Sequence, residues 1–203
     1  MAELPLFPLR TVLYPEGLLE LRIFEARYLD LISRSLRERT PFGVVALRSG
    51  SEARSGTGDD AVRLYDAGTL AELIDVDSAE AGILLVRCRG GERFKVGETR
   101  RERDGLWVAK AEPIAPDPHE EPAPAHADAV QALADAIAAL AAQGAKPFLE
   151  PERFDSAGWV ANRWCEILPL PLEVRQRLLT LASPTARLDV VASLLRARDE
   201  RPA

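Results

Sequence analysis

The sequence predicts an α+β protein in which a β-rich N-terminal half is followed by a helical C-terminal half. Up to about residue 115, apolar residues mostly alternate with polar ones, which is the period of a half-buried strand. Beyond that point, apolar residues recur three and four positions apart, which is the period of a helix. Between the two halves, residues 115–124 contain four prolines among acidic residues, a composition typical of a linker. We therefore expect a β-rich domain over 1–116, a proline-rich acidic linker over 117–125 and a helical domain over 126–203.

The first strand and turn are indicated by proline and glycine. Apolar residues alternate with Pro5 and Pro8, which favours an edge strand because proline cannot donate to a strand ladder. Residues 14–17 read Tyr-Pro-Glu-Gly, a turn signal in which proline presets φ and glycine tolerates a positive φ. Alternating leucine and isoleucine over 19–23 then predict a short half-buried strand.

A helix and five further strands complete the predicted first half. The helix covers 25–39, because Tyr28, Leu29, Ile32 and Leu36 form one apolar stripe at helical spacing. A polar, glycine-rich segment at 49–60 is expected to be a flexible insertion. The dipeptides at 90–91 and 104–105, Gly-Gly and Asp-Gly, indicate hairpin turns. The strands are expected at 42–47, 62–74, 83–89, 94–100 and 106–114.

The second half is predicted to contain four helices. Val130, Leu133, Ile137 and Leu140 mark an amphipathic helix of roughly 18 residues. Shorter helices are expected around 159–167, 172–181 and 184–195, the last with Ser183 as its N-cap. Together they predict a small helical bundle.

Composition and missing motifs exclude several classes of function. The formal net charge of -6 argues against a general nucleic-acid binder. The N-terminus does not read as a signal peptide and the sequence has no apolar stretch of membrane-spanning length, so we expect a cytoplasmic protein. The sequence contains neither a phosphate-binding Gly-Lys loop, nor GxGxxG, nor GxSxG. A familiar enzymatic mechanism is therefore not expected.

The cysteines and histidines are expected to be structural. Cys88 and Cys165 lie far apart, and a disulfide between them would be unusual in a chain without a secretion signal. Cys88 lies within a predicted strand, which favours a buried thiol over a nucleophile. His119 and His126 are expected to be solvated linker residues, because their spacing with Glu120 and Glu121 fits no metal motif. We expect neither a metal nor a cofactor.

Several short motifs follow one another along the chain in a recognisable order. In the first half they are Leu4-Pro5-Leu6-Phe7-Pro8-Leu9-Arg10, the turn at 14–17, Leu21-Arg22-Ile23-Phe24-Glu25-Ala26-Arg27-Tyr28, Gly68-Thr69-Leu70-Ala71 and Arg89-Gly90-Gly91-Glu92-Arg93-Phe94. In the second half they are Trp164 with Ile167-Leu168-Pro169-Leu170, then Gln176-Arg177-Leu178-Leu179 and Ala186-Arg187-Leu188. This ordered set resembles the N-terminal, substrate-binding domain of Lon proteases from residue 4 to about 196.

The resemblance implies a fold and a function. The implied fold is a twisted, PUA-like β pseudo-barrel that carries one helix and is followed by a helical bundle. The ATPase and peptidase modules of Lon proteases have no counterpart in the 203 residues, so the chain looks like a free-standing, non-catalytic binding domain. The implied partners are exposed apolar segments of unfolded or client proteins, in the context of protein quality control. Such a segment could add a strand at an exposed edge or lie in an apolar groove.

Five side chains are the candidate binding residues: Phe24, Arg27, Tyr28, Arg93 and Trp107. Of these, Phe24 and Trp107 are the large apolar side chains expected to line a groove. A packing role is the competing interpretation, since Tyr28 can pack on the sheet and Arg93 lies in a predicted strand.

Other functions stay open on the sequence alone. A dedicated adaptor with one partner is an alternative, because the resemblance extends to cereblon, whose related domain is a scaffold. A PUA-like RNA binder is a third reading that the acidic charge disfavours. An enzyme of unfamiliar mechanism also stays open, and the oligomeric state is undetermined.

Overall fold

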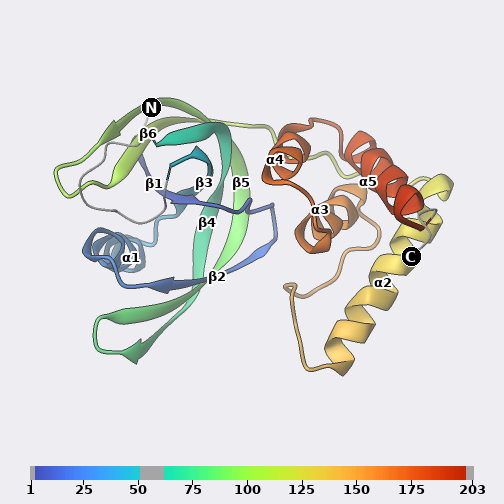
Figure 1. The fold of residues 1–203 in the computed structure, drawn as a ribbon, viewed down its shortest axis with the longest axis horizontal. Coiled ribbons are helices and arrows are strands. Elements are labelled where there is room, and N and C mark those ends of the chain that lie inside the picture. The colour runs from blue at the N-terminus through green and yellow to red at the C-terminus, as the bar shows by residue number, and fades with distance from the viewer. Residues whose placement is uncertain (1–2, 51–61, 200–203) are drawn as a thin grey trace. The chain divides into compact units, whose positions relative to one another are not determined.

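The computed structural model describes residues 3–50 and 62–199, and it divides into two compact units, Met1–Ala115 and Pro116–Ala203. Within these ranges, the first unit is a mixed sheet with one helix, and the second consists of helices and their connections (Figure 1). No helix among the described residues is long and apolar enough to cross a bilayer.

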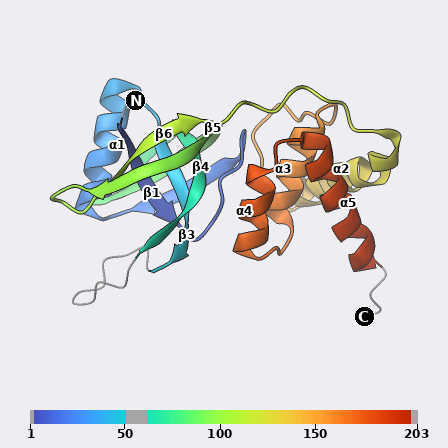
Figure 2. The same ribbon diagram turned by 90° about the horizontal axis from the view of Figure 1, so that it is seen from above.

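The described part of the first unit contains six strands and helix α1. Their bounds are β1 Glu3–Leu9, β2 Leu18–Ile23, α1 Ala26–Glu38, β3 Phe42–Ser49, β4 Arg63–Glu80, β5 Ile83–Arg101 and β6 Trp107–Pro113. Helix α1 and strands β1, β2, β3 and β6 form close to their expected positions, whereas β4 extends beyond its expected end at residue 74 and the strands expected at 83–89 and 94–100 are one strand, β5. Residues 51–60 of the expected insertion lie outside the described residues. Helix α1 lies between the tips of the β4–β5 and β5–β6 hairpins (Figure 1), and both ribbon views place it on one side of the strands (Figures 1 and 2).

The sheet is closed by its longest strand. The strand order is β2-β5-β4-β3-β1-β6, and an additional pairing of β5 with β6 joins five strands into a ring. On one edge of β5, β2 pairs with residues 84–89 and β6 pairs with residues 94–101. All pairings are antiparallel except that of β1 with β3.

The expected hairpin at Gly90-Gly91 is wrong, because β5 runs straight through it. Gly90 lies where β5 changes partner from β2 to β6. Its N–H donates to the Gly17 carbonyl at 2.8 Å, and its carbonyl accepts from the Glu16 N–H at 2.7 Å. A Cβ at Gly90 would lie 2.0 Å from the Tyr14 carbonyl oxygen. The glycine therefore permits the turn at 14–17 to approach the strand, and does not itself make a turn.

Strand β1 is likewise not the edge strand that its prolines suggested, since it lies between β3 and β6. Pro5 is in register with β6 at Val108, whereas the register with β3 begins only at Leu6. Pro8 is in register with β3, beyond the end of the β6 register. Each proline therefore lies where one side of β1 is unpaired, so its missing N–H can face that side.

The core of the first unit has two parts. The larger lies under α1 and includes Tyr28, Leu31 and Ile32, which face Phe7 and Phe42 from the strands. The smaller is formed by Leu6, Val45, Phe94 and Ala109. Successive residues of β1 enter different clusters, as expected when side chains alternate across a strand.

As far as residue 199, the second unit contains a 3-10 turn, η1 (Pro124–His126), and four helices. They are α2 Ala127–Ala142, α3 Ala157–Ile167, α4 Leu172–Thr180 and α5 Pro184–Asp199. Ser183 caps α5 as expected, since its Oγ accepts from the Ala186 N–H at 3.1 Å. The indole of Trp164 is buried and donates to the Ala129 carbonyl at 2.9 Å, which ties α3 to α2.

The acidic segment at 117–125 is bound to the helices of the second unit and is not merely solvated. The guanidinium of Arg187, on α5, is fully buried and binds both carboxylate oxygens of Asp117 at 2.6 and 3.2 Å. The Thr185 hydroxyl donates to the Glu120 carboxylate. His126 is buried rather than solvated: its Nδ1 accepts from the Ala123 N–H, so Nε2 carries the proton that it donates to Asp189 at 2.7 Å.

Candidate functional site

Helix α1 positions the candidate site, and its ends are set by local geometry. Arg39 follows the helix in the left-handed conformation with φ of 53°, and its N–H returns to the Ser35 carbonyl. The buried face carries Tyr28, Leu31 and Ile32. Leu36 belongs to the same sequence stripe, yet its side chain is 49% exposed, because the strands do not cover the last turn of the helix.

The five candidate residues occupy different environments. Tyr28 is buried and its ring stacks on Phe7 with centroids 4.0 Å apart, so it packs in the core. The Arg27 guanidinium lies 4.6 Å from the Tyr28 ring centroid and binds the Glu25 carboxylate at 2.8 Å. Phe24, immediately before this group, is 62% exposed.

The other two candidates lie in the closing strands β5 and β6. Arg93 is buried and its Nη2 donates to the Ala115 carbonyl at 3.1 Å, so it anchors the end of the first unit. Trp107 is half-buried on β6, where the Arg101 guanidinium lies 4.5 Å from its ring centroid. Of the five, Phe24 therefore offers the most apolar surface to a ligand.

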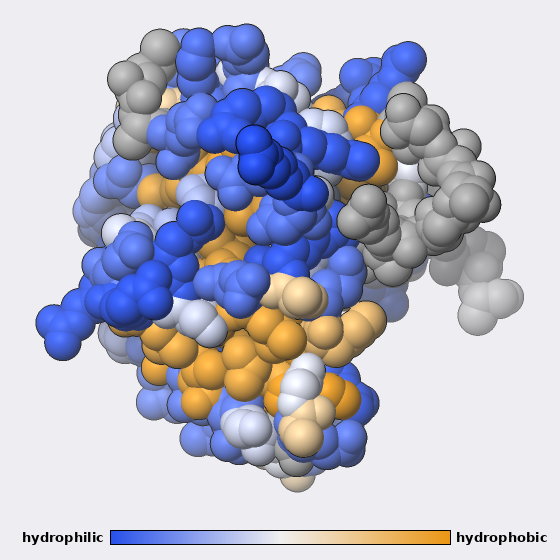
Figure 3. Space-filling view, turned by 90° about the vertical axis from the view of Figure 1, so that its left-hand side faces the viewer, coloured by the Kyte–Doolittle hydropathy of each residue, from blue (hydrophilic) through white to orange (hydrophobic). Residues whose placement is uncertain are grey.

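Around α1 lie further apolar side chains that the sequence analysis did not name as candidate binding residues. Half-buried leucines and a valine pack on the core from α1, β2, β4 and β5. Leu36 is exposed and lines a pocket together with Leu73, and Phe24 is exposed immediately after β2. We call this set the apolar surface: Leu21, Phe24, Leu29, Leu36, Leu73, Val76 and Leu84. A space-filling view shows a continuous apolar area on this side of the first unit (Figure 3). The sequence analysis did not predict this surface, because the polar composition of residues 75–80 did not indicate that β4 extends so far.

A groove deepens the apolar surface where α1 ends. Its volume is about 520 Å³. It is lined by Ser35 and Leu36 of α1, by residues 39–41 and by Glu72 and Leu73 of β4, and we call it the α1–β4 groove.

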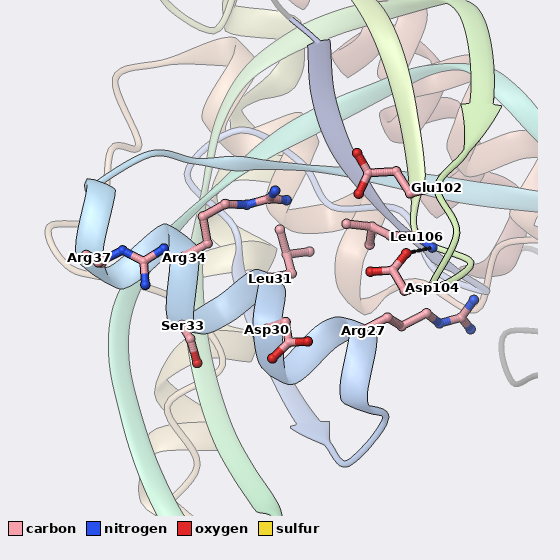
Figure 4. Close-up of a pocket in the computed structure, with 9 residues that line it drawn as sticks. All are labelled: Arg27, Asp30, Leu31, Ser33, Arg34, Arg37, Glu102, Asp104 and Leu106. Carbon is pink, nitrogen blue, oxygen red and sulfur yellow. Dashed lines mark hydrogen bonds between the residues drawn. The ribbon is translucent and has the colours of Figure 1, made fainter.

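A second, smaller cavity of about 320 Å³ lies between α1 and the β5–β6 hairpin. Its apolar base is Leu31 and Leu106, and its charged lining is Arg27, Arg34, Arg37, Asp30, Glu102 and Asp104. Figure 4 shows the Arg34 side chain extending toward the side of Glu102, with Leu31 between α1 and the hairpin. The Asp104 carboxylate accepts from the Leu106 N–H at 2.9 Å and so shapes the turn. Three cations and three carboxylates balance, so this cavity selects neither an anion nor a cation.

Nucleophilic and metal-binding chemistry finds little support among the described residues. Both cysteines are buried and neither forms a disulfide, and burial raises the pKa of Cys88 to about 12. A group of three or more histidine, cysteine or carboxylate side chains placed to hold a metal does not occur in the part of the chain that the structure describes.

Comparison with known proteins identifies the family of the chain. Residues 3–197 match the family described as ATP-dependent protease La (LON) substrate-binding domain. The chain is 28% identical over 208 residues to Lon protease of Anaeromyxobacter dehalogenans (strain 2CP-C), and 25% identical over 201 residues to Lon protease 2 of Myxococcus xanthus. These alignments cover 98% and 97% of this chain but 24% of each relative, so the chain spans about a quarter of their length.

Solved structures extend the comparison to the fold. A Lon N-terminal domain protein from Xanthomonas campestris superposes with a TM-score of 0.74 and 31% identity, covering 95% of this chain and 98% of that one. The N-terminal domain of Mycobacterium avium complex Lon protease gives a TM-score of 0.62 at 15% identity, covering 95% and 97%, which shows the same fold. The chain therefore belongs to the LON substrate-binding domain family and is about the size of that domain alone.

Proposed function

We propose that this chain is a non-catalytic protein-binding module that holds exposed apolar segments of unfolded or client polypeptides, in the service of protein quality control. The observation that carries the proposal is the apolar surface, in which Phe24 is 62% and Leu36 49% exposed beside half-buried leucines. Contiguous apolar area of this kind typically marks a surface that binds proteins. Membership of a substrate-binding family supports the same function. A cytoplasmic location stays a prediction from the sequence.

A permanently unfolded protein tests the proposal. Reduced, alkylated α-lactalbumin, labelled with a fluorophore, would be titrated with the chain and followed by anisotropy. Phe24→Ser combined with Leu36→Ser should weaken binding about tenfold or more, because burying each side chain contributes on the order of 1 kcal/mol. The matched control is Val190→Ser with Leu194→Ser on α5, whose side chains are 41% and 37% exposed.

Each result has a defined meaning. Equal binding by the two double variants would refute the location of the site. A chain that binds no unfolded protein, but captures one stoichiometric partner from its own lysate, would indicate a dedicated adaptor instead. A salt-sensitive shift in the electrophoretic mobility of RNA, caused by the chain, would favour nucleic-acid binding.

A further inference from the structure

Strand β4 has an open edge over its second half. On one side it pairs with β5 along almost its whole length, from Ala67 to Glu80. On the other side it pairs with β3 only as far as Ala71, which is in register with Phe42 at the start of β3. The chain before Phe42 turns away through Pro41 into α1. Residues 72–80 therefore lack a strand partner on that side among the described residues. Apart from the Ser78 N–H, which donates to the Asp77 carboxylate at 2.8 Å, the backbone N–H and C=O groups that face this side can pair with an added strand.

The open edge begins at the α1–β4 groove. Glu72 and Leu73 contribute to both, and Leu36 and Pro41 form the opposite wall. A strand added beside residues 72–80 would continue the line of β3 and enter the groove at one end. Because side chains alternate along a strand, every second residue of such a guest would face the apolar surface at Leu73 and Val76.

The same edge is acidic. Glu72, Asp75, Asp77 and Glu80 are all exposed, and none of them makes an ion pair among the described residues. Arg87 is in register with Asp75 on β5, but its guanidinium binds Glu20 at 3.3 Å. The negative charge of this edge repels a second copy of the same edge, and it attracts a guest that carries lysine or arginine.

We propose that residues 72–80 of β4 bind an extended polypeptide segment as an additional strand, and that this guest has apolar residues alternating with lysine or arginine. The apolar residues enter the α1–β4 groove and cover Leu73 and Val76, while the basic residues lie against the carboxylates of the edge. This inference rests on the proposed function and assigns to it a binding mode and a class of substrate. The second open edge, that of β2, carries both Glu20 and Arg22 and has no such charge preference.

Synthetic peptides test the inference. The probe is a fluorescent nine-residue peptide in which leucine and valine alternate with lysine, compared with the same peptide carrying glutamate. The lysine peptide should bind about tenfold more tightly at low salt, since two exposed ion pairs at roughly threefold each multiply to that factor. N-methylation of alternate backbone amides should reduce its affinity at least tenfold, because strand addition depends on those hydrogen bonds.

Two matched triple variants locate the charge effect. Asp75→Asn, Asp77→Asn and Glu80→Gln should abolish the preference for the lysine peptide. The same change in net charge at exposed sites elsewhere in the first unit, Asp66→Asn, Glu92→Gln and Glu112→Gln, should leave the preference within about twofold of its original value. Hydrogen exchange should show new protection of amides in 72–80 when the lysine peptide binds.

Equal affinity for the lysine and glutamate peptides would overturn the charge assignment. Undiminished binding of the N-methylated peptide, or protection confined to β2, would overturn strand addition at β4. If the peptides fail to bind while unfolded α-lactalbumin still binds through Phe24 and Leu36, this inference fails and the proposed function stands. If unfolded α-lactalbumin also fails to bind, both fail.

Discussion

Replacement of Arg187 by methionine should destabilise the second unit by about 3–5 kcal/mol, the usual cost of removing one partner from a buried ion pair. All five N–H donors of this buried guanidinium are used. Nε donates to the Leu178 carbonyl at 2.9 Å, and Nη1 and Nη2 bind Asp117. Nη1 also donates to Asn162 Oδ1 at 3.0 Å, and Nη2 donates to the Leu181 carbonyl at 2.7 Å. Methionine fills similar volume but removes the hydrogen bonds that the guanidinium donates to the Asp117 carboxylate, to Asn162 Oδ1 and to two backbone carbonyls.

Tryptophan fluorescence can follow the second unit by itself. In a Trp107→Phe background the remaining tryptophans are Trp159 and Trp164, which are both buried in the second unit. With a urea m-value of about 1.5 kcal/mol/M, a loss of about 3 kcal/mol lowers the unfolding midpoint by about 2 M. Reading one unit avoids assuming that both unfold in a single transition.

Arg177→Met is the matched control, because its guanidinium is 78% exposed and pairs with Glu173 on the helix surface. That change should cost less than about 1 kcal/mol. Asp117→Asn should fall between the two, since the amide oxygen still accepts a hydrogen bond. A midpoint for Arg187→Met within about 0.5 M of the control would refute the view that this guanidinium holds the acidic segment to the helices.

Three further predictions concern the close approach at β5, a buried carboxyl and a buried thiol. Gly90→Ala should destabilise the first unit by about 2 kcal/mol or more, because the added Cβ would meet the Tyr14 carbonyl oxygen. Gly91→Ala is the control and should cost much less, because its Cβ would meet only the movable end of a glutamate side chain. Equal urea midpoints for the two variants would contradict this prediction. Burial raises the pKa of Glu166 to about 7 from the ordinary 4.5, so between these pH values the folded state binds more protons than the unfolded state. The stability of the second unit should therefore fall by about 1–3 kcal/mol as the pH rises from 5 to 8. Glu166→Gln should remove that fall, and an unchanged pH profile would exclude Glu166 as its source. At pH 8 the Cys88 thiol should react with a disulfide reagent about a thousandfold more slowly in the folded chain than in urea, and a comparable rate in both would show that the strand is open.

The local elements were predictable because their periods are clear. Helix α1 was expected at 25–39 and is observed at Ala26–Glu38, and the four helices of the second half lie where apolar spacing indicated. The mixed sheet with helices of a Lon N-terminal domain followed from the order of the motifs.

Pairing between strands was less accessible to sequence analysis, because partners far apart in the chain decide it. Gly90 reads as a turn, but its role is set by a backbone approach from residues 14–17. Pro5 and Pro8 read as an edge, but β1 changes partners between them. His126 reads as solvated, although Asp189 on α5 and a neighbouring backbone amide hold its ring.

The candidate site was predicted only in part, because exposure depends on which strands cover which helix turn. Phe24 was among the expected residues and is exposed. Tyr28 and Arg93 were also expected, but both are buried by packing. Leu36 was assigned to the apolar stripe of α1 and is exposed, because periodicity identifies a face of the helix but not how much of that face is covered.

In the ring of the first unit, the first strand, β1, pairs with the last strand, β6, and this order has a consequence for synthesis on the ribosome. Strand β1 is made first, before either of its partners. Glu3 of β1 is in register with Lys110 of the antiparallel strand β6, and the parallel strand β3 begins only at Phe42. A nascent chain that ends before residue 107 therefore carries β1 without β6, so Leu6 lacks Trp107, its partner in the closing ladder. The ring can close only after β6 has left the exit tunnel, so the first unit should acquire protease resistance in one late step as the helical unit begins to be made.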